Sequence, residues 1–120
     1  MKKIVLIVSA FMLVCGVQVA SAKTSTLTLS AGKAVHYQCD NGARVSGIYY
    51  NLSDNSLSFV KLTFNKEQYT LPSVVAASGV RYSDGRMLEW WEHAGEVLFN
   101  QEVNNSSSSA VVCKEVATHR

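Results

Sequence analysis

The chain has 120 residues and a formal net charge of +2, and two of its lysines, Lys2 and Lys3, lie at the extreme N-terminus. Without these two lysines, nine basic residues balance nine acidic residues, so the remainder is formally neutral. A neutral domain of this size excludes broad electrostatic capture of nucleic acid or of anionic membranes.

The first 22 residues have the parts of a secretory signal peptide. Two lysines follow Met1, an apolar run covers 4–14, and Ala20 and Ala22 form an A-x-A cleavage pattern. The apolar run is too short for a permanent membrane span, so we expect no stable membrane insertion. Removing 22 of the 120 residues leaves 98, residues 23–120, which is enough for one small domain.

Cys15 raises the question of lipid attachment. A bacterial lipoprotein cleavage site has a small residue immediately before the modified cysteine, whereas Val14 precedes Cys15 here. We therefore expect Cys15 to be discarded with the signal peptide and the mature protein to be soluble in the periplasm.

Cys39 and Cys113 are the two cysteines of the predicted mature chain. In an oxidising exported compartment, an isolated pair of this kind predicts a disulfide rather than two free thiols. The two positions lie 74 residues apart, a separation for which the chain-entropy model gives a stabilisation of about 4 kcal/mol.

The rest of the chain consists of short strand-like segments separated by turns. Val35, Tyr37 and Cys39 have the period of two that is typical of a strand, and Asp40-Asn41-Gly42 is a strong hairpin signal. No segment after residue 22 has helical periodicity. The strand-like segments are 23–30, 35–39, 45–50, 57–64, 68–71, 74–77, 87–91, 96–103 and 110–113.

Two of these segments carry an irregularity. In 57–64 the apolar residues change from odd to even positions, which predicts a bulge or a residue buried on both faces. Pro72 cannot donate a hydrogen bond to a sheet, so it predicts an edge or the start of a new strand. If Pro72 lies at an edge, 68–71 and 74–77 belong to one strand, and the segments amount to seven or eight antiparallel strands. So many short strands in so small a chain predict a barrel or a sandwich, and we favour a barrel because closure removes exposed edges.

The stretch 76–85, AASGVRYSDG, is the strongest candidate for a binding segment. Ser78-Gly79 lacks side-chain bulk, so its backbone and hydroxyl can approach another surface closely. Arg81 and Tyr82 belong to residue types that are enriched in binding hot spots, and Asp84-Gly85 is a strong turn dipeptide. The stretch predicts a loop that a rigid β-scaffold presents to a protein partner.

Catalytic and metal chemistry are poorly supported. Ser78 could be a nucleophile with His93 and Asp84 as helpers, but the G-x-S-x-G elbow and its strand-to-helix turn are missing. The histidines are scattered at 36, 93 and 119, and the mature cysteines are assigned to the predicted disulfide. We therefore expect no enzymatic activity, no metal and no cofactor.

Trp90 and Trp91 are adjacent in a predicted strand. Because neighbouring strand residues point to opposite faces, only one indole can face the interior. The other indole covers a second surface on the rim or contacts a partner.

Several of these residues occur together, in this order, in one family. They are Tyr37-x-Cys39-Asp40, Tyr49-Tyr50-Asn51, Leu71-Pro72, the run 77–85, Trp91, Glu96 and Cys113. On these residues, which span about 35–115, the chain resembles the bacterial inhibitors of c-type lysozyme, a family with membrane-bound and soluble periplasmic members. Without a lipoprotein cleavage site, it is similar to the soluble branch.

The resemblance implies an eight-stranded antiparallel barrel with one disulfide and c-type lysozyme as the partner. In the family, a loop enters the lysozyme cleft, where a serine of the SG motif and a lysine of a second motif meet the catalytic carboxylates. Ser78-Gly79 matches the SG motif, and Arg81 lies in the same SG-x-RY-x-DG run. Tyr82 matches a tyrosine thought to hold the loop in shape.

The second motif of the family, W-x-K-G-x-E, is altered in this chain. Aligning Trp91 and Glu96 places His93 at the lysine position, and a shift of one residue places Glu92 there. The expected lysozyme-binding residues are Ser78, Gly79, Arg81, Tyr82, and His93 or Glu92.

The competing interpretation is a barrel that carries a small apolar ligand. A chain this short with many large apolar side chains should fill its own interior, which favours the inhibitor. The sequence leaves open whether the protein forms a homodimer.

Overall fold

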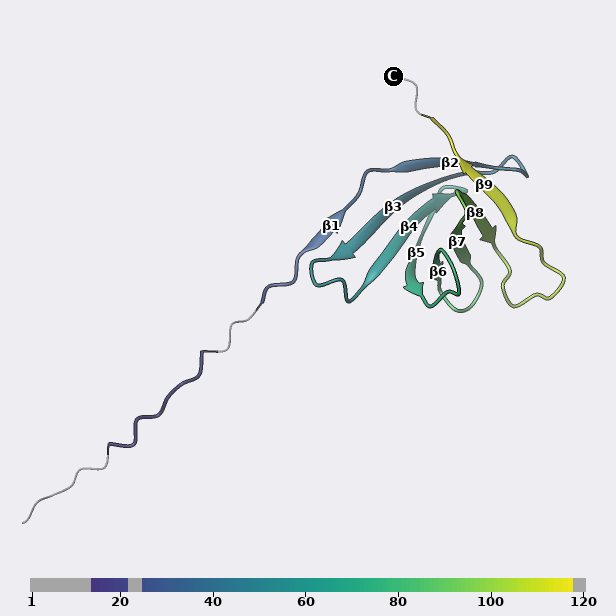
Figure 1. Cartoon of the computed structure of the whole chain (residues 1–120). Coiled ribbons are helices and arrows are strands. Elements are labelled where there is room, and N and C mark those ends of the chain that lie inside the picture. Colours follow the sequence, from purple (N-terminus) through teal and green to yellow (C-terminus); the bar gives the residue numbers. More distant parts are fainter. Residues whose placement is uncertain (1–13, 22–24, 118–120) are drawn as a thin grey trace, which may run out of the picture.

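The computed structural model of the chain describes residues 14–21 and 25–117, which form nine strands and contain no helix (Figure 1). No helix long and apolar enough to cross a membrane occurs within these two ranges. The predicted cleavage site after Ala22 lies outside the described residues. The strands are β1 (Leu29–Ala31), β2 (Val35–Cys39), β3 (Arg44–Leu52), β4 (Ser58–Phe64), β5 (Glu67–Val74), β6 (Val80–Ser83), β7 (Glu89–His93), β8 (Glu96–Asn100) and β9 (Val111–Glu115).

Eight of the strands close into an antiparallel barrel, as predicted. Neighbouring strands follow the order β3-β2-β9-β8-β7-β6-β5-β4, and the pairing of β4 with β3 closes the circle. β1 is an additional strand that pairs with the end of β3 beyond the part that β2 covers. β1 has three residues, of which the first two are the end of the predicted segment 23–30 and the third is Ala31.

The alternation of side chains along the strands places one apolar set inside the barrel. Trp90 and Leu62 are fully buried, and Phe99 is nearly so. The rings of Trp90 and Phe99 meet edge to face with centroids 5.3 Å apart, a favourable arrangement for aromatic pairs. These side chains occupy the interior that the apolar-ligand interpretation would need.

β4 does not contain the bulge that the sequence suggested. Its register against both β3 and β5 runs without interruption from Phe59 to Thr63. The apparent phase change arises because Phe59 lies on the outer face, where its ring stacks on Tyr50 with centroids 4.8 Å apart. Leu57 precedes the strand.

Pro72 lies inside β5 rather than at the start of a strand. It is opposite Phe59 of β4, whereas the pairing of β5 with β6 begins only at Ser73. On the side of β5 that faces β6, Pro72 therefore has no strand partner. A proline is tolerated at such an edge position because it has no amide hydrogen to donate.

The predicted disulfide between Cys39 and Cys113 is present and buried. The two cysteines are direct partners in the pairing of β2 with β9. The bond therefore joins the first and last strands of the barrel, which are 74 residues apart along the chain.

Replacing both cysteines, Cys39→Ala with Cys113→Ala, should lower the free energy of unfolding by about 2–5 kcal/mol, because the unfolded chain loses its cross-link. Urea denaturation of the oxidised wild type and of the double variant measures the difference. The wild type under reducing conditions is the matched control and should show a similar loss. Equal stability of all three samples would contradict this role for the bond.

Candidate functional site

The connection between β5 and β6, Val75–Gly79, lies at the same end of the barrel as the turn between β7 and β8. Gly79 has a φ of +67°, and a Cβ at this position would lie 2.0 Å from the carbonyl oxygen of Glu92. Only glycine allows this close approach of the two backbones. We call Val75–Gly79 the SG loop.

Two side chains hold the backbone of the SG loop. The indole Nε1 of Trp91 donates to the carbonyl oxygen of Ser78 at 2.8 Å. Arg81 donates from Nη1 to the carbonyl oxygen of Val75 at 3.4 Å, and its Nε donates to Glu89 at 2.6 Å. Trp91 and Arg81 therefore fix the loop from opposite ends.

The Ser78 side chain is exposed, and the described residues offer its hydroxyl no hydrogen-bond partner. Trp91 holds the backbone of Ser78, whereas the Ser78 hydroxyl is available to bind a partner. The loop thus presents one hydroxyl on a constrained backbone.

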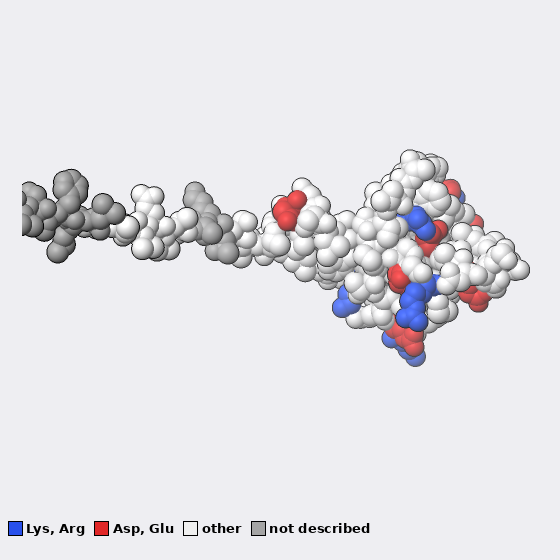
Figure 2. Space-filling view, turned by 90° about the horizontal axis from the view of Figure 1, so that it is seen from below, with Lys and Arg blue, Asp and Glu red and all other residues white. Residues whose placement is uncertain are grey.

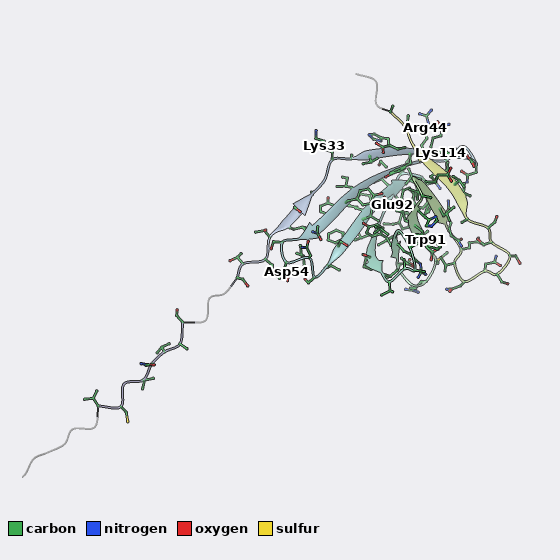
Figure 3. The ribbon with its side chains drawn as sticks, in the orientation of Figure 1. Lys33, Arg44, Asp54, Trp91, Glu92 and Lys114 are labelled. Atoms are coloured by element: carbon green, nitrogen blue, oxygen red, sulfur yellow. A yellow bond between two sulfur atoms is a disulfide. The ribbon has the colours of Figure 1, made fainter. Side chains whose placement is uncertain are left out.

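Glu92 and His93 leave β7 on opposite faces, because Trp90 points into the barrel and the direction alternates along the strand. His93 is exposed beside Trp91, with ring centroids 5.7 Å apart. The Cβ position of Gly79 is 3.3 Å from the Cα of His93, so His93 adjoins the SG loop directly. Trp91 and Glu92, which Figure 3 labels, are consecutive residues of β7.

The carboxylate of Glu92 points inward and accepts a hydrogen bond from the hydroxyl of Tyr49. The same Tyr49 oxygen accepts a hydrogen bond from Trp90 Nε1 at 3.0 Å and lies 2.9 Å from the Tyr37 hydroxyl. A hydroxyl has one proton and two lone pairs, so Tyr37 is the donor in the last pair. Tyr49 therefore has every hydrogen-bonding position in use.

Burial is the main cause that raises the pKa of Tyr49, and its hydrogen bonds to Glu92 and Tyr37 raise it further. The phenol keeps its proton and remains a donor to the Glu92 carboxylate. The sequence places Tyr49 in the predicted strand 45–50 and among the residues that carry the family resemblance, but it predicts no role for Tyr49 in the site. Its inward direction becomes clear only once the barrel is closed.

Tyr82 is 7% exposed and faces the interior, with its ring centroid 5.8 Å from that of Tyr49. Burial, followed by the nearby charge of Glu92, raises its pKa. The described residues provide no hydrogen bond to its hydroxyl, so Tyr82 contacts the core chiefly through its ring. It is placed to support β6, which continues the SG loop.

The stretch 76–85 does not form a single binding segment. β6 crosses the barrel wall within it, so Asp84-Gly85 lies at the opposite end from Ser78. The Asp84 carboxylate there accepts hydrogen bonds from three successive backbone amides at 2.8–3.0 Å. Because Asp84 is at the far end, Ser78, His93 and Asp84 do not assemble into a catalytic triad.

A hollow of about 340 Å³ opens beside the SG loop. Gly79 and the β7–β8 hairpin form its walls, and the buried side chains of Tyr37 and Cys113 lie at its base. Glu96 and Glu115 also line it, and Figure 2 shows acidic and basic side chains interspersed over the folded part of one face. Within the described ranges, no group of three His, Cys, Asp or Glu side chains could hold a metal ion.

Comparison with known proteins shows which family the chain resembles. The profile of the family described as membrane-bound lysozyme-inhibitor of c-type lysozyme matches residues 37–107. Proteins named membrane-bound lysozyme inhibitor of C-type lysozyme are similar in sequence. The one from Pseudomonas aeruginosa is 30% identical over 83 residues, which cover 69% of this chain and 65% of the relative.

A second relative of that name, from Cupriavidus necator, is 39% identical over 64 residues, or 53% of this chain and 49% of the relative. A third, from Yersinia enterocolitica, is 34% identical over 82 residues, or 68% of this chain and 59% of the relative. The matched part therefore spans between about half and two thirds of these relatives.

A solved structure shares the fold. The inhibitor MliC of Pseudomonas aeruginosa, crystallised in complex with hen egg white lysozyme, superposes with a TM-score of 0.58. The superposition covers 77% of this chain and 88% of that chain, at 24% sequence identity. Because the family profile matches more than half of the sequence, the chain belongs to the family of membrane-bound lysozyme inhibitors of c-type lysozyme.

Proposed function

We propose that this protein inhibits c-type lysozyme by inserting the loop end of the segment Ser78–Tyr82 into the active-site cleft, while the buried Tyr82 holds the other end in the barrel wall. We also propose that it is not itself an enzyme. The observation that carries the proposal is the exposed Ser78 hydroxyl on a loop whose backbone is held by Trp91 and Arg81. Membership of the inhibitor family supports c-type lysozyme as the partner.

The chemistry of lysozyme explains why such a loop suffices. The enzyme works with two carboxylates about 5 Å apart across the scissile bond. A hydroxyl that donates to one of them forms a charge-assisted hydrogen bond, and the loop itself excludes the sugar. Because the SG loop is already fixed, little conformational entropy is lost on binding.

His93 is the better candidate for the second contact. It is exposed and adjoins the SG loop, whereas the Glu92 carboxylate is directed inward to Tyr49. A protonated imidazole attracts a carboxylate, whereas a second carboxylate would repel it. Arg81 and Tyr82 contribute by holding the loop and β6, and Gly79 by allowing the close approach to Glu92.

We further propose that residues 1–22 are a signal peptide and that residues 23–120 are the mature periplasmic domain. The support is the A-x-A pattern at Ala20–Ala22 and the valine before Cys15. The relatives are named membrane-bound, so lipid attachment at Cys15 is the alternative. The intact mass of the exported protein distinguishes a chain that begins at Lys23 from a lipidated chain that begins at Cys15.

Ser78→Ala should weaken inhibition by about 10- to 150-fold, because a hydrogen bond to a charged group contributes about 1.5–3 kcal/mol. The backbone contact with Trp91 stays, so the melting temperature should not change. Inhibition constants against a c-type lysozyme and thermal unfolding measure the two effects.

Ser109→Ala is the matched control for Ser78→Ala. Ser109 is also exposed, but it precedes β9 at the opposite end of the barrel from the SG loop. The control should inhibit like the wild type. If Ser78→Ala also inhibits like the wild type, Ser78 is not part of the contact.

Inhibition should weaken more strongly with rising pH than inhibition by a His93→Lys variant. An unperturbed histidine loses its charge near pH 6.5, whereas lysine stays charged through the neutral range. A carboxylate partner favours the protonated imidazole in the complex, so binding is tighter below neutrality and weaker above it.

The catalytic acid of lysozyme titrates in the same range, so the pH profile of the wild type alone is insufficient. The informative quantity is the ratio of the inhibition constants of the wild type and His93→Lys, measured at mildly acidic and mildly alkaline pH. The ratio should shift in favour of lysine at the higher pH. A flat ratio would remove His93 from the second contact.

A further inference from the structure

The outer face of β2, β3 and β4 carries a group of hydrogen-bond donors far from the SG loop. His36 is opposite Ser46, Gln38 is opposite Arg44, and Ser46 is opposite Thr63. Side chains directly opposite each other in antiparallel strands have Cβ atoms about 5 Å apart, so these residues form one continuous group. We call the five residues the donor group.

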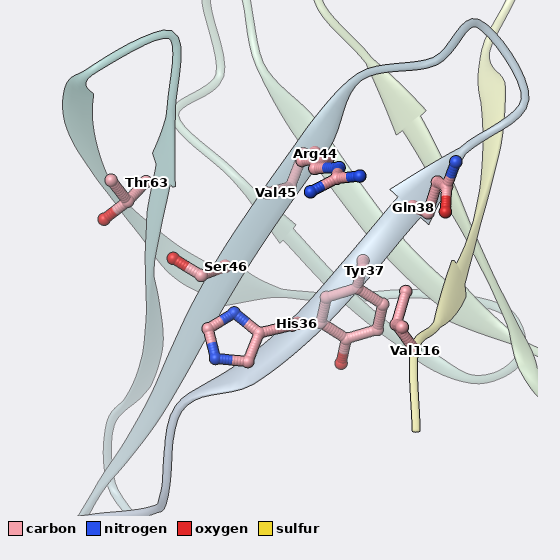
Figure 4. A pocket seen from close by; sticks show the side chains of 8 residues that line it. All are labelled: His36, Tyr37, Gln38, Arg44, Val45, Ser46, Thr63 and Val116. Atoms are coloured by element: carbon pink, nitrogen blue, oxygen red, sulfur yellow. The ribbon is translucent and has the colours of Figure 1, made fainter. Parts of the chain in front are cut away.

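The donor group lines a concave site rather than a flat strand surface. A pocket of about 430 Å³ is bordered by all five residues, and Val116 lies at one margin (Figure 4). The backbone amide of Val116 donates to the carbonyl oxygen of His36 at 2.8 Å, which fixes this margin against β2. A volume of this size lies within the range of small-molecule sites.

The strands that form the pocket carry basic residues and no acidic ones. β2, β3 and β4 contain no aspartate or glutamate, although they carry Arg44 and Lys61. Arg44 has no ion-pair partner within the described ranges. Lys114 of β9 is opposite Gln38 and lies on the same side as Arg44 (Figure 3), and Glu96 already engages it at 3.6 Å.

We propose that the pocket binds a sugar that bears a phosphate monoester. The planar fork of Arg44 matches two oxygens of a phosphate, and the hydroxyls of Ser46 and Thr63 can donate to others. Gln38 both donates and accepts, as recognition of a sugar hydroxyl requires. The pocket is larger than a phosphate ion, which leaves room for one sugar ring.

Arg44 lies on the opposite side of the barrel from β7, although Tyr37 lines both this pocket and the hollow beside the SG loop. In the closed barrel, β3 is four strands from β7 in either direction, so the two strands lie on opposite sides. Ligand binding at Arg44 therefore goes beyond the inhibition of lysozyme and does not depend on it. A variant at Arg44 should inhibit lysozyme like the wild type.

The test is a titration of the isotope-labelled exported protein with glucose 6-phosphate, followed by NMR. Saturable shifts should appear at the backbone amides of β2, the first half of β3 and Thr63. Arg44→Gln should weaken this binding by at least about tenfold, a loss typical of a bidentate contact. Lysozyme inhibition by the same variant should be unchanged, which separates this proposal from the proposed function.

Arg86→Gln is the matched control, since Arg86 is an exposed arginine of the β6–β7 connection. It should bind glucose 6-phosphate like the wild type. Glucose without phosphate should produce no saturable shifts, and inorganic phosphate should bind more weakly than the sugar phosphate. Equal effects of Arg44→Gln and Arg86→Gln, or no saturable shifts at the donor group, would overturn the proposal.

Discussion

The close contact between Gly79 and the backbone of Glu92 is the constraint on which the candidate site depends. At 2.0 Å from the Glu92 carbonyl oxygen there is no space for a Cβ, so the chain must be glycine at this point. The contact places the SG loop directly against the end of β7, where Trp91 can reach the carbonyl of Ser78. Because β7 belongs to a closed barrel, the contact holds the loop backbone against the barrel, while the Ser78 side chain stays exposed.

Hydrogen bonds and ring contacts in the barrel interior hold the end of β7 in this contact. Tyr49 of β3 reaches across the barrel to Glu92, and its oxygen is bonded to Trp90 as well. The ring of Tyr37 meets Trp90 edge to face with centroids 4.9 Å apart, and Tyr37 also belongs to the strand that the disulfide joins to β9. The packed core is therefore connected to the hydrogen bonds of Tyr49 and Glu92. A substitution in the core near Trp90 would displace β7, and through β7 the SG loop, although the substituted residue does not touch the partner.

Much of the fold follows from the sequence, because period-two segments and strong turn signals set the strands. The predicted strand boundaries were less accurate. The strand predicted at 87–91 begins at Glu89, because Asp84 binds the amides of 86–88 in a turn. The strand predicted at 96–103 ends at Asn100. The pair Trp90-Trp91 illustrates what sequence alone leaves open. Either indole could face inward, and that choice decides whether Glu92 or His93 is exposed. The packing of Trp90 against Phe99 and Tyr37 determines it, and both contacts come from distant strands. The role of Tyr49 was missed for the same reason.

The most direct test of lysozyme inhibition through the SG loop is a crystal structure of the complex between this protein and a c-type lysozyme. The SG loop should lie in the active-site cleft, with the Ser78 hydroxyl within hydrogen-bonding distance of a catalytic carboxylate. The loop backbone should keep its contacts with Trp91 and Glu92 and change little on binding. A complex in which lysozyme contacts another face of the barrel, with the SG loop outside the cleft, would contradict it.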